Sequence, residues 1–340
     1  MEGKAKVREF LSEIEKELGE LPKDLHVTRM CCALIAVSEG RIIKAEKPRL
    51  KYCPLRARDN LYKFKNFDLE EICNAVNLKM SRFGYFTKER ELYREKIEVK
   101  YGVSEILMYA LSKKGIDAAV TVCDGAGTVI TSEPSLVQGI GARMTGVFYT
   151  SPIKELIQRI EERKGYVVFP ETARIDQIAG LEKAIKLGFN RIAVTINGFA
   201  GEDLRRVREV EKRTNASITA LIVCTTGITK ERAEEIKKYA DLTQGCASLY
   251  VREIVGRAAR LQIATRLPVF ALTQKGIDFV SNYSSEIFKE FIQEGKKYLI
   301  SGYHKLMKNP RKIRMGNFYT YIGEVEDLPL RVEDEPTPLI

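Results

Sequence analysis

The chain has 340 residues, 44% of them hydrophobic and 30% charged, and a net charge of +10. This length suits one large α/β domain or two domains. The sequence lacks both the roughly 18 consecutive apolar residues of a membrane span and the apolar core of an N-terminal signal peptide, so a cytoplasmic protein is expected.

The first hundred residues predict a helix, a β-hairpin and a second helix. Residues 5–20 have the spacing of an exposed amphipathic helix, and two β-rich runs within 27–48 flank a glycine-containing turn. The run 68–84 has helical spacing, with Asp68 placed as its N-cap and Gly84 as its stop. We assign residues 1–100 to a region made of these elements.

Apolar runs and helical patterns alternate from about residue 104 onward. After a helix over 104–114, the runs that indicate strands are 118–123, 166–169, 191–196, 218–224, 241–246 and 267–273. Helical patterns separate most of them, as in βα units. The sequence therefore predicts an α/β fold with a mostly parallel, doubly wound sheet over residues 101–310.

A (β/α)8-like barrel is the alternative architecture. It requires eight strands, and residues 147–150 together with the N-terminal hairpin could supply the two that are missing. A long helical stretch from about 276 to 307 is expected to close the domain. Residues 311–340 indicate one short strand and an acidic, proline-rich tail.

Cysteines recur where the predicted strands end, which is the ligand-binding edge of a parallel sheet or barrel. Cys123, Cys224 and Cys246 occupy equivalent positions on three strands, and Cys53 lies in a loop. Thiolates gathered in this way would suit an iron–sulfur cluster or another metal. The alternative is that each cysteine is a small buried apolar residue.

The numbers and spacing of cysteines and histidines exclude some classes of metal site. In a cytoplasmic chain the seven cysteines are expected to be reduced thiols. No CxxC spacing occurs, which excludes the local motifs of zinc ribbons and thioredoxins. The two histidines are too few for a histidine-rich metal site.

Two glycine-bearing loops could bind an anion through their backbone N–H groups. The predicted ligand-binding residues are Asp124, Gly125, Gly127 and Thr128 in the first loop and Thr225, Thr226 and Gly227 in the second. Ser248, which follows the strand after the second loop, is predicted to bind the ligand as well. Glu171 and Asp176 follow another strand and could act as general acid and base or bind a hard metal. For Asp176 the alternative is helix capping.

The positive charge is concentrated in two segments. Residues 41–65 hold nine basic side chains and two acidic ones, whereas 296–314 hold seven basic and no acidic ones. Such a surplus is typical of hyperthermophile charge networks, and no nucleic-acid-binding motif accompanies it. We therefore expect neither nucleic acid nor a membrane as partner. A docking surface for an acidic protein is the other use considered for these segments.

The same residues carry a resemblance to an archaeal family called methanogenesis marker protein 8, a domain of unknown function. The similarity extends over about residues 28–280. The motifs that carry it are YCP (52–54), VSEIL (103–107), VCDGAGTVI (122–130), SLVQGIGARMTG (135–146), PETARIDQI (170–178), TTGI (225–228), CAS (246–248) and PVFALT (268–273). The resemblance implies a supporting role in methyl-coenzyme M metabolism, with methyl-coenzyme M reductase or its assembly factors as partners.

Three hypotheses of function remain open. The first is an accessory protein of archaeal methyl-coenzyme M metabolism that holds a metal or iron–sulfur cluster through Cys123 and Cys246, with Cys53 and Cys224 as auxiliary ligands. The second is an enzyme that binds a phosphate or carboxylate compound at the glycine-bearing loops. The third is a partner-binding module without chemistry. The sequence does not decide whether the protein is an enzyme.

Overall fold

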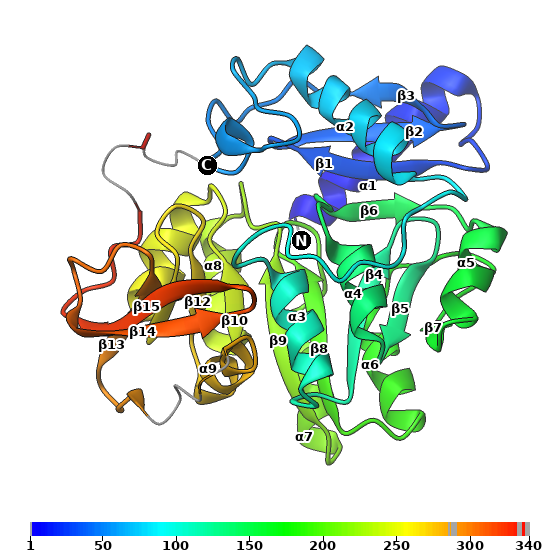
Figure 1. The fold of residues 1–340 in the computed structure, drawn as a ribbon. Coiled ribbons are helices and arrows are strands. Elements are labelled where there is room, and N and C mark those ends of the chain that lie inside the picture. The colour runs from blue at the N-terminus through cyan, green and yellow to red at the C-terminus, as the bar shows by residue number, and fades with distance from the viewer. Residues whose placement is uncertain (1, 285, 287–290, 332–334, 337–340) are drawn as a thin grey trace.

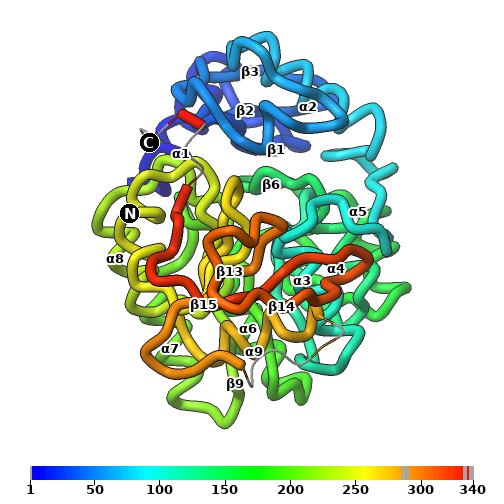
Figure 2. The backbone as a smooth tube through the Cα atoms, turned by 60° about the vertical axis from the view of Figure 1, so that its left-hand side comes forward, coloured from blue at the N-terminus to red at the C-terminus, as the bar shows by residue number. Residues whose placement is uncertain are grey.

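The protein consists of a small N-terminal layer placed over the end of a large mixed sheet (Figure 1). The computed structural model describes residues 2–284, 286, 291–331 and 335–336. The small sheet has the strand order β3-β2-β1-β6, and the large one has the order β14-β15-β13-β11-β12-β10-β9-β8-β4-β5-β7. Figure 2 shows the same two layers after a 60° turn.

The small layer is an antiparallel sheet between two helices. Its elements are α1 (Glu2–Leu18), β1 (His26–Met30), β2 (Ala33–Ser38), β3 (Arg41–Ala45), β6 (Val147–Thr150) and α2 (Leu69–Phe83). Helix α1 packs on one face through Phe10 and Ile14, and α2 packs on the other through Ile72 and Val76. The two helices form as predicted, and β2 and β3 make the predicted hairpin. The first β-rich run is broken into two strands, β1 and β2, because Cys31 and Cys32 form a turn with φ values of +49° and +68°.

Four parallel strands form the centre of the large sheet: β4 (Ala118–Cys123), β8 (Arg191–Asn197), β9 (Ser217–Val223) and β10 (Leu242–Gln244). The strands around this block are β5 (Gly127–Thr131), β7 (Gly165–Val167), β11 (Leu261–Ile263), β12 (Val269–Ala271), β13 (Lys297–Ser301), β14 (Lys308–Met315) and β15 (Phe318–Val325). The central block is the parallel sheet that the βα periodicity predicts.

Helices cover both faces of this block, as in a doubly wound fold. Helices α6 (Gln177–Lys186), α7 (Leu204–Arg213) and α8 (Lys230–Tyr239) pack on one face. Helices α3 (Val103–Ser112) and α9 (Gln274–Ser281) pack on the other. The remaining helical segments are α4 (Pro134–Gly141), α5 (Lys154–Glu161), η1 (Arg56–Arg58) and the π-helical turn η2 (Val251–Gly256). Alternate residues of β8 serve the two cores, since Val194 contacts the first group and Ala193 the second.

The prediction of a mostly parallel sheet is wrong outside the central block. Six of the ten strand pairings in the large sheet are antiparallel. Strand β4 leads into a hairpin and not into a helix, because Gly125 and Gly127 adopt φ values of +77° and +67° that a tight turn needs. The barrel alternative is also wrong, since the large sheet of the described chain stays open, with β14 and β7 at its two edges.

The long helix predicted over 276–307 is likewise not formed. Helix α9 ends at Ser281, and β13 begins at Lys297 (residues 285 and 287–290 of this stretch lie outside the described chain). Strand β13 pairs with β11 on one side and β15 on the other, so tertiary pairing overrides the local helical pattern. The expected acidic tail lies partly in the undescribed residues 332–334 and 337–340. None of the helices in the described ranges combines the length and apolarity needed to cross a bilayer.

Candidate functional site

A cavity of about 900 Å³ lies between the two layers, at the carboxyl ends of the parallel strands. Its floor includes Thr121 of β4, Asn197 of β8, and Cys224 and Cys246, which follow β9 and β10. The N-terminal layer supplies the opposite wall from α1, α2 and the loop at 55–62. This is the edge where open α/β sheets bind ligands, and the volume falls within the usual range for small-molecule sites.

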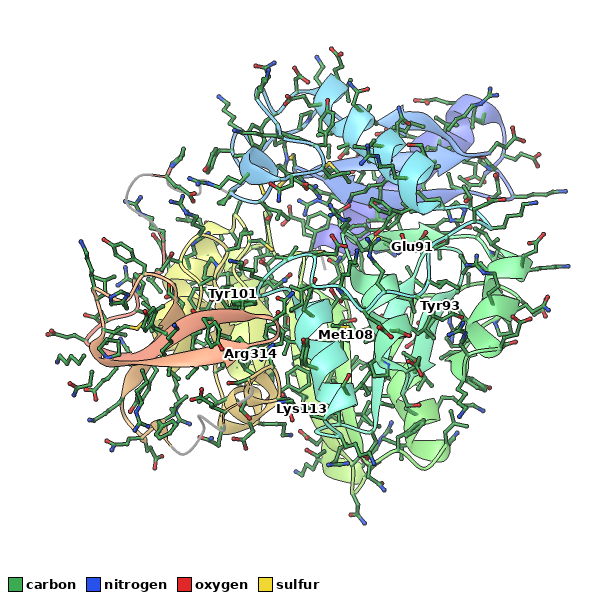
Figure 3. All side chains as sticks on the ribbon, viewed as in Figure 1. Glu91, Tyr93, Tyr101, Met108, Lys113 and Arg314 are labelled. Carbon is green, nitrogen blue, oxygen red and sulfur yellow. The ribbon has the colours of Figure 1, made fainter. Side chains whose placement is uncertain are left out.

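A third part of the wall comes from the segment 98–105, which the C-terminal strands hold in place. Tyr101, labelled in Figure 3, lies beside the β14–β15 hairpin. Its hydroxyl is 2.9 Å from that of Thr320, and its ring packs against Phe318. The carboxylate of Glu105 accepts hydrogen bonds from the backbone N–H groups of Glu98 and Val99. The wall is thus fixed by contacts with segments far away in the sequence.

Basic side chains outnumber acidic ones around the cavity. The basic lining residues are Lys4, Arg8, Arg56, Arg58, Lys79, Lys100, Arg143 and Arg266, and the acidic ones are Asp59, Glu98, Glu105 and Glu202. Some of these charges compensate each other, as in the Arg56–Asp59 pair at 2.8 Å and the Arg143–Glu98 pair. Even with Lys79 left out of the count, basic lining residues exceed acidic ones by three, which favours an anionic occupant.

Lys79 is a cavity residue that the sequence analysis missed. Its side chain is 5% exposed, and its Nζ donates a hydrogen bond of 2.6 Å to the carbonyl oxygen of Arg143. No carboxylate of the described chain forms an ion pair with it. Burial first, and then the nearby charges of Arg56 and Arg90, hold the pKa of Lys79 well below its usual value, although the charge of Asp59 acts in the opposite direction. One signal was present, because Lys79 stands seven residues after Ile72 on the buried face of α2.

The backbone is unusual at several points of the cavity wall. Arg143, Cys224, Cys246 and Ala264 all line the cavity with φ values of +60°, +56°, +43° and +60°. Non-glycine residues rarely adopt this conformation, and it concentrates at functional sites, where the surrounding structure must impose it. The Nε atom of Arg143 is also buried without a hydrogen-bond partner in the described chain. These features support the cavity as the functional site.

Two of the four predicted metal-binding cysteines lie in the cavity wall. Burial, with a contribution from Cys246, raises the pKa of the Cys224 thiol to about 12. Cys53 is not a lining residue, but Cys246 also raises the pKa of its thiol, after the larger effect of burial. Cys123 is fully buried in a separate apolar cluster, where its thiol donates to the carbonyl oxygen of Asp124 at 3.3 Å. The structure therefore brings together Cys224 and Cys246 but not Cys123.

A metal centre formed entirely by the protein does not emerge from this arrangement. Within the described residues, no three or more His, Cys, Asp and Glu side chains are grouped so that they could hold a metal ion. Cys224 and Cys246 supply two thiols, whereas protein-bound iron–sulfur clusters usually have four protein ligands.

The turn that contains Asp124 is occupied by protein contacts. The fully buried Asp124 forms an ion pair of 3.0 Å with Arg90 and accepts a hydrogen bond from the N–H of Phe86. The N–H groups of Gly125, Ala126 and Thr128 donate to Thr150, Cys123 and Arg174. Position 127 needs glycine for close packing, since a Cβ there would lie 2.1 Å from the carbonyl oxygen of Ala173. These amides are therefore engaged and the turn does not line the cavity.

The second glycine-bearing loop and Ser248 tie the two cysteine loops to each other. The hydroxyl of Thr225 donates to the carbonyl oxygen of Gln244 at 2.6 Å, and the hydroxyl of Thr226 accepts from the N–H of Ala247 at 3.3 Å. The hydroxyl of Ser248 accepts a hydrogen bond of 3.3 Å from the N–H of Val251, at the start of the π-helical turn. Gly227, at φ +72°, turns the loop toward α8. These residues position Cys224 and Cys246.

The predicted acid and base lie outside the cavity lining. Glu171 is exposed in the loop that follows the edge strand β7. Asp176 caps α6 by accepting from the N–H of Ala179 at 2.9 Å, which is the capping role given as its alternative. Its neighbours Ile175 and Gln177 line the cavity in its place.

Together these features define an α/β protein with a basic, thiol-bearing cavity between a mixed sheet and an antiparallel layer. Residues 26–284 match a family described as an uncharacterized protein conserved in archaea (DUF2099), and the chain belongs to this family. It is also similar to the uncharacterized protein MJ0054 of Methanocaldococcus jannaschii, with 37% identity over 308 residues, which cover 91% of this chain and 96% of that protein. The finer resemblance to methanogenesis marker protein 8 stays an expectation.

Proposed function

We propose that the protein binds a small molecule carrying a phosphate or carboxylate group in the cavity between its two layers. The observation that carries this proposal is the basic surplus in the cavity wall at the carboxyl ends of β4, β8, β9 and β10. Among the lining cations, Arg56, Arg143 and Arg266 are buried or partly buried, and the attraction of such a cation for an anion is stronger than in bulk water. The anion-binding groups are cavity side chains and not the backbone of the Asp124 turn.

Arg143 is the side chain that we assign to the anion. It lines the cavity in a left-handed backbone conformation, and its Nε lacks a partner in the described chain. Its guanidinium group already pairs with Glu98, which fixes its orientation before the ligand arrives. A preorganised guanidinium is well suited to phosphate and carboxylate groups because its N–H donors match their geometry.

Isothermal titration calorimetry with glycerol 3-phosphate and a panel of dicarboxylates tests this proposal. Removing a charged donor costs about 1.5–3 kcal/mol, so Arg143→Gln should weaken binding by roughly ten- to a hundredfold. Arg205→Gln on the exposed face of α7 is the matched control and should leave the affinity unchanged. Absence of millimolar binding by every anion in the panel would contradict the proposal.

The second candidate is the metal- or cluster-binding accessory protein of methyl-coenzyme M metabolism. One observation favours it: Cys224 and Cys246 lie in one cavity at the ends of neighbouring strands, with Cys53 close to them. The other ligands of a metal or iron–sulfur cluster would then come from Cys53 or from outside the chain. Methyl-coenzyme M reductase or its assembly factors remain the partners proposed for such a role.

Anaerobic purification followed by iron reconstitution, metal analysis and visible spectroscopy tests this candidate. Bound iron should be lost in Cys224→Ala and in Cys246→Ala. It should be retained in Cys123→Ala and Cys73→Ala, because Cys123 lies in a separate core and Cys73 is outside the cavity lining. Protein that stays colourless and metal-free after reconstitution contradicts the candidate.

A further inference from the structure

We propose that Lys79 is a nucleophilic amine and that the ligand of the cavity is an aldehyde or ketone bearing a phosphate or carboxylate, which Lys79 binds as an imine. This inference rests on the proposed anion-binding function and names the substrate class of the same site.

Burial of the Lys79 amine has a free-energy cost that its protein contacts do not offset. Helix α2 places it on the face that holds Ile72, Ala75 and Val76, so the four-carbon stem is buried with the core. Its Nζ ends at the cavity wall with one protein acceptor, the carbonyl oxygen of Arg143. A buried ammonium without a carboxylate partner is unfavourable, and a neutral glutamine could donate the same hydrogen bond. A structural role alone therefore does not explain a lysine here.

The surroundings of Lys79 favour the neutral, nucleophilic form of the amine. Arg56, Arg143 and the acidic Asp59 lie on the same wall, and Arg90 is nearby. Asp59 acts in the opposite direction, but it is paired with Arg56 at 2.8 Å. Like charges and removal from water both disfavour protonation, which is how lysines that form imines are activated in proteins. The buried aromatic ring of Tyr85 lies 5.7 Å from Nζ and is not part of the cavity lining.

The reaction needs no redox partner. The nitrogen lone pair of Lys79 attacks the carbonyl carbon, and a C–N bond forms. The carbonyl oxygen leaves as water with the two amine protons, which yields the imine. Arg143 beside the amine would hold the anionic end of the ligand and so orient the carbonyl group toward Nζ.

Reductive trapping with dihydroxyacetone phosphate and sodium borohydride, followed by peptide mass mapping, tests this proposal on the full chain. One adduct at Lys79 is expected. Labelling of exposed lysines should rise about tenfold per pH unit below their pKa of ~10.4. Labelling of Lys79 should level off at a lower pH than theirs, because burial holds its pKa well below the usual value. An adduct spread over exposed lysines, with Lys79 unlabelled, would overturn the proposal.

Variants sharpen the assignment. Lys79→Arg should abolish the adduct, and Lys79→Met serves the same purpose if the arginine variant does not fold by circular dichroism. Lys212→Met, which changes an exposed lysine of α7 outside the cavity lining, is the matched control and should label like the parent chain. Unchanged labelling in either folded Lys79 variant would refute the inference, and the pH profile of the parent chain tests it without any variant.

Two further probes separate this inference from the proposed function. Glycerol 3-phosphate has no carbonyl group and reports on the anion site alone. If it binds but dihydroxyacetone phosphate gives no borohydride-dependent adduct, the anion-binding function stands and the imine proposal is overturned. Acetaldehyde has no anionic group and reports on the amine alone. If it is trapped at Lys79 but glycerol 3-phosphate does not bind, Lys79 is a nucleophile and the proposed anionic ligand class is overturned.

Discussion

Two buried basic side chains near the ring of Tyr85 are compensated in different ways. Arg90 forms an ion pair with Asp124, donates to the carbonyl oxygens of Gly139 and Ile140, and stacks on Tyr85 with 3.8 Å between its Cζ and the ring centre. Lys79 donates one hydrogen bond to a carbonyl oxygen and forms no ion pair with a carboxylate of the described chain. A fully paired charge is a structural feature, whereas an unpaired amine is available for chemistry.

The Arg90–Asp124 pair leads to a stability prediction. Asp124→Asn removes the compensating charge and leaves the Arg90 guanidinium buried, which should lower the free energy of unfolding by about 3–5 kcal/mol. Denaturation with guanidinium chloride, followed by circular dichroism, measures this change. Glu2→Gln, which removes an exposed partner of Lys6, is the control and should have little effect. A change for Asp124→Asn as small as that of the control would contradict this account.

At the scale of elements, α2 connects local sequence signals to the cavity. The carboxylate of Asp68 accepts from the N–H of Glu71, and the carboxylate of Glu71 accepts from the N–H groups of Lys65, Asn66 and Phe67. At the other end, Gly84 adopts φ +63° and donates to the carbonyl oxygen of Met80. Both ends of the helix that carries Lys79 are therefore fixed by short-range interactions.

We expect Asp68→Ala to lower the free energy of unfolding by about 1 kcal/mol, because the cap at the start of α2 is lost. Glu70→Ala in the same turn is the matched control, since Glu70 is exposed and makes no capping bond in the described chain. Chemical denaturation of the two variants side by side measures the difference. Equal stability of both would show that the N-terminal cap does not determine the position of α2.

At the scale of the whole molecule, the cavity exists because two layers meet. The central strands supply its floor, the N-terminal layer covers the strand ends, and the β14–β15 hairpin supports the segment 98–105 (Figures 1 and 2). The chain crosses between the layers more than once, since β6 leaves the large sheet region to pair with β1. A ligand in this cavity would therefore contact segments that are distant in the sequence.

The sequence by itself determined the elements whose signals are local. Apolar runs separated by helical patterns predicted β8, β9 and β10, and Asp68 and Gly84 predicted both ends of α2. The rule that ligands bind at the carboxyl ends of parallel strands predicted that Cys224 and Cys246 lie at that edge of the sheet, and both line the cavity there. These predictions depend on hydrogen bonds and side-chain periodicity within a few residues, so a single sequence contains them.

Only the tertiary structure decided which side chains share the cavity. Cys123 and Cys246 follow the same local pattern, yet one is buried beside α4 and α5 and the other lines the cavity. Lys79 resembles any polar helical residue until the layers are assembled around it. Strand β13 is held by partners on both sides that lie far away in the sequence. Burial, pairing and charge compensation depend on such distant neighbours, and local sequence patterns do not specify them.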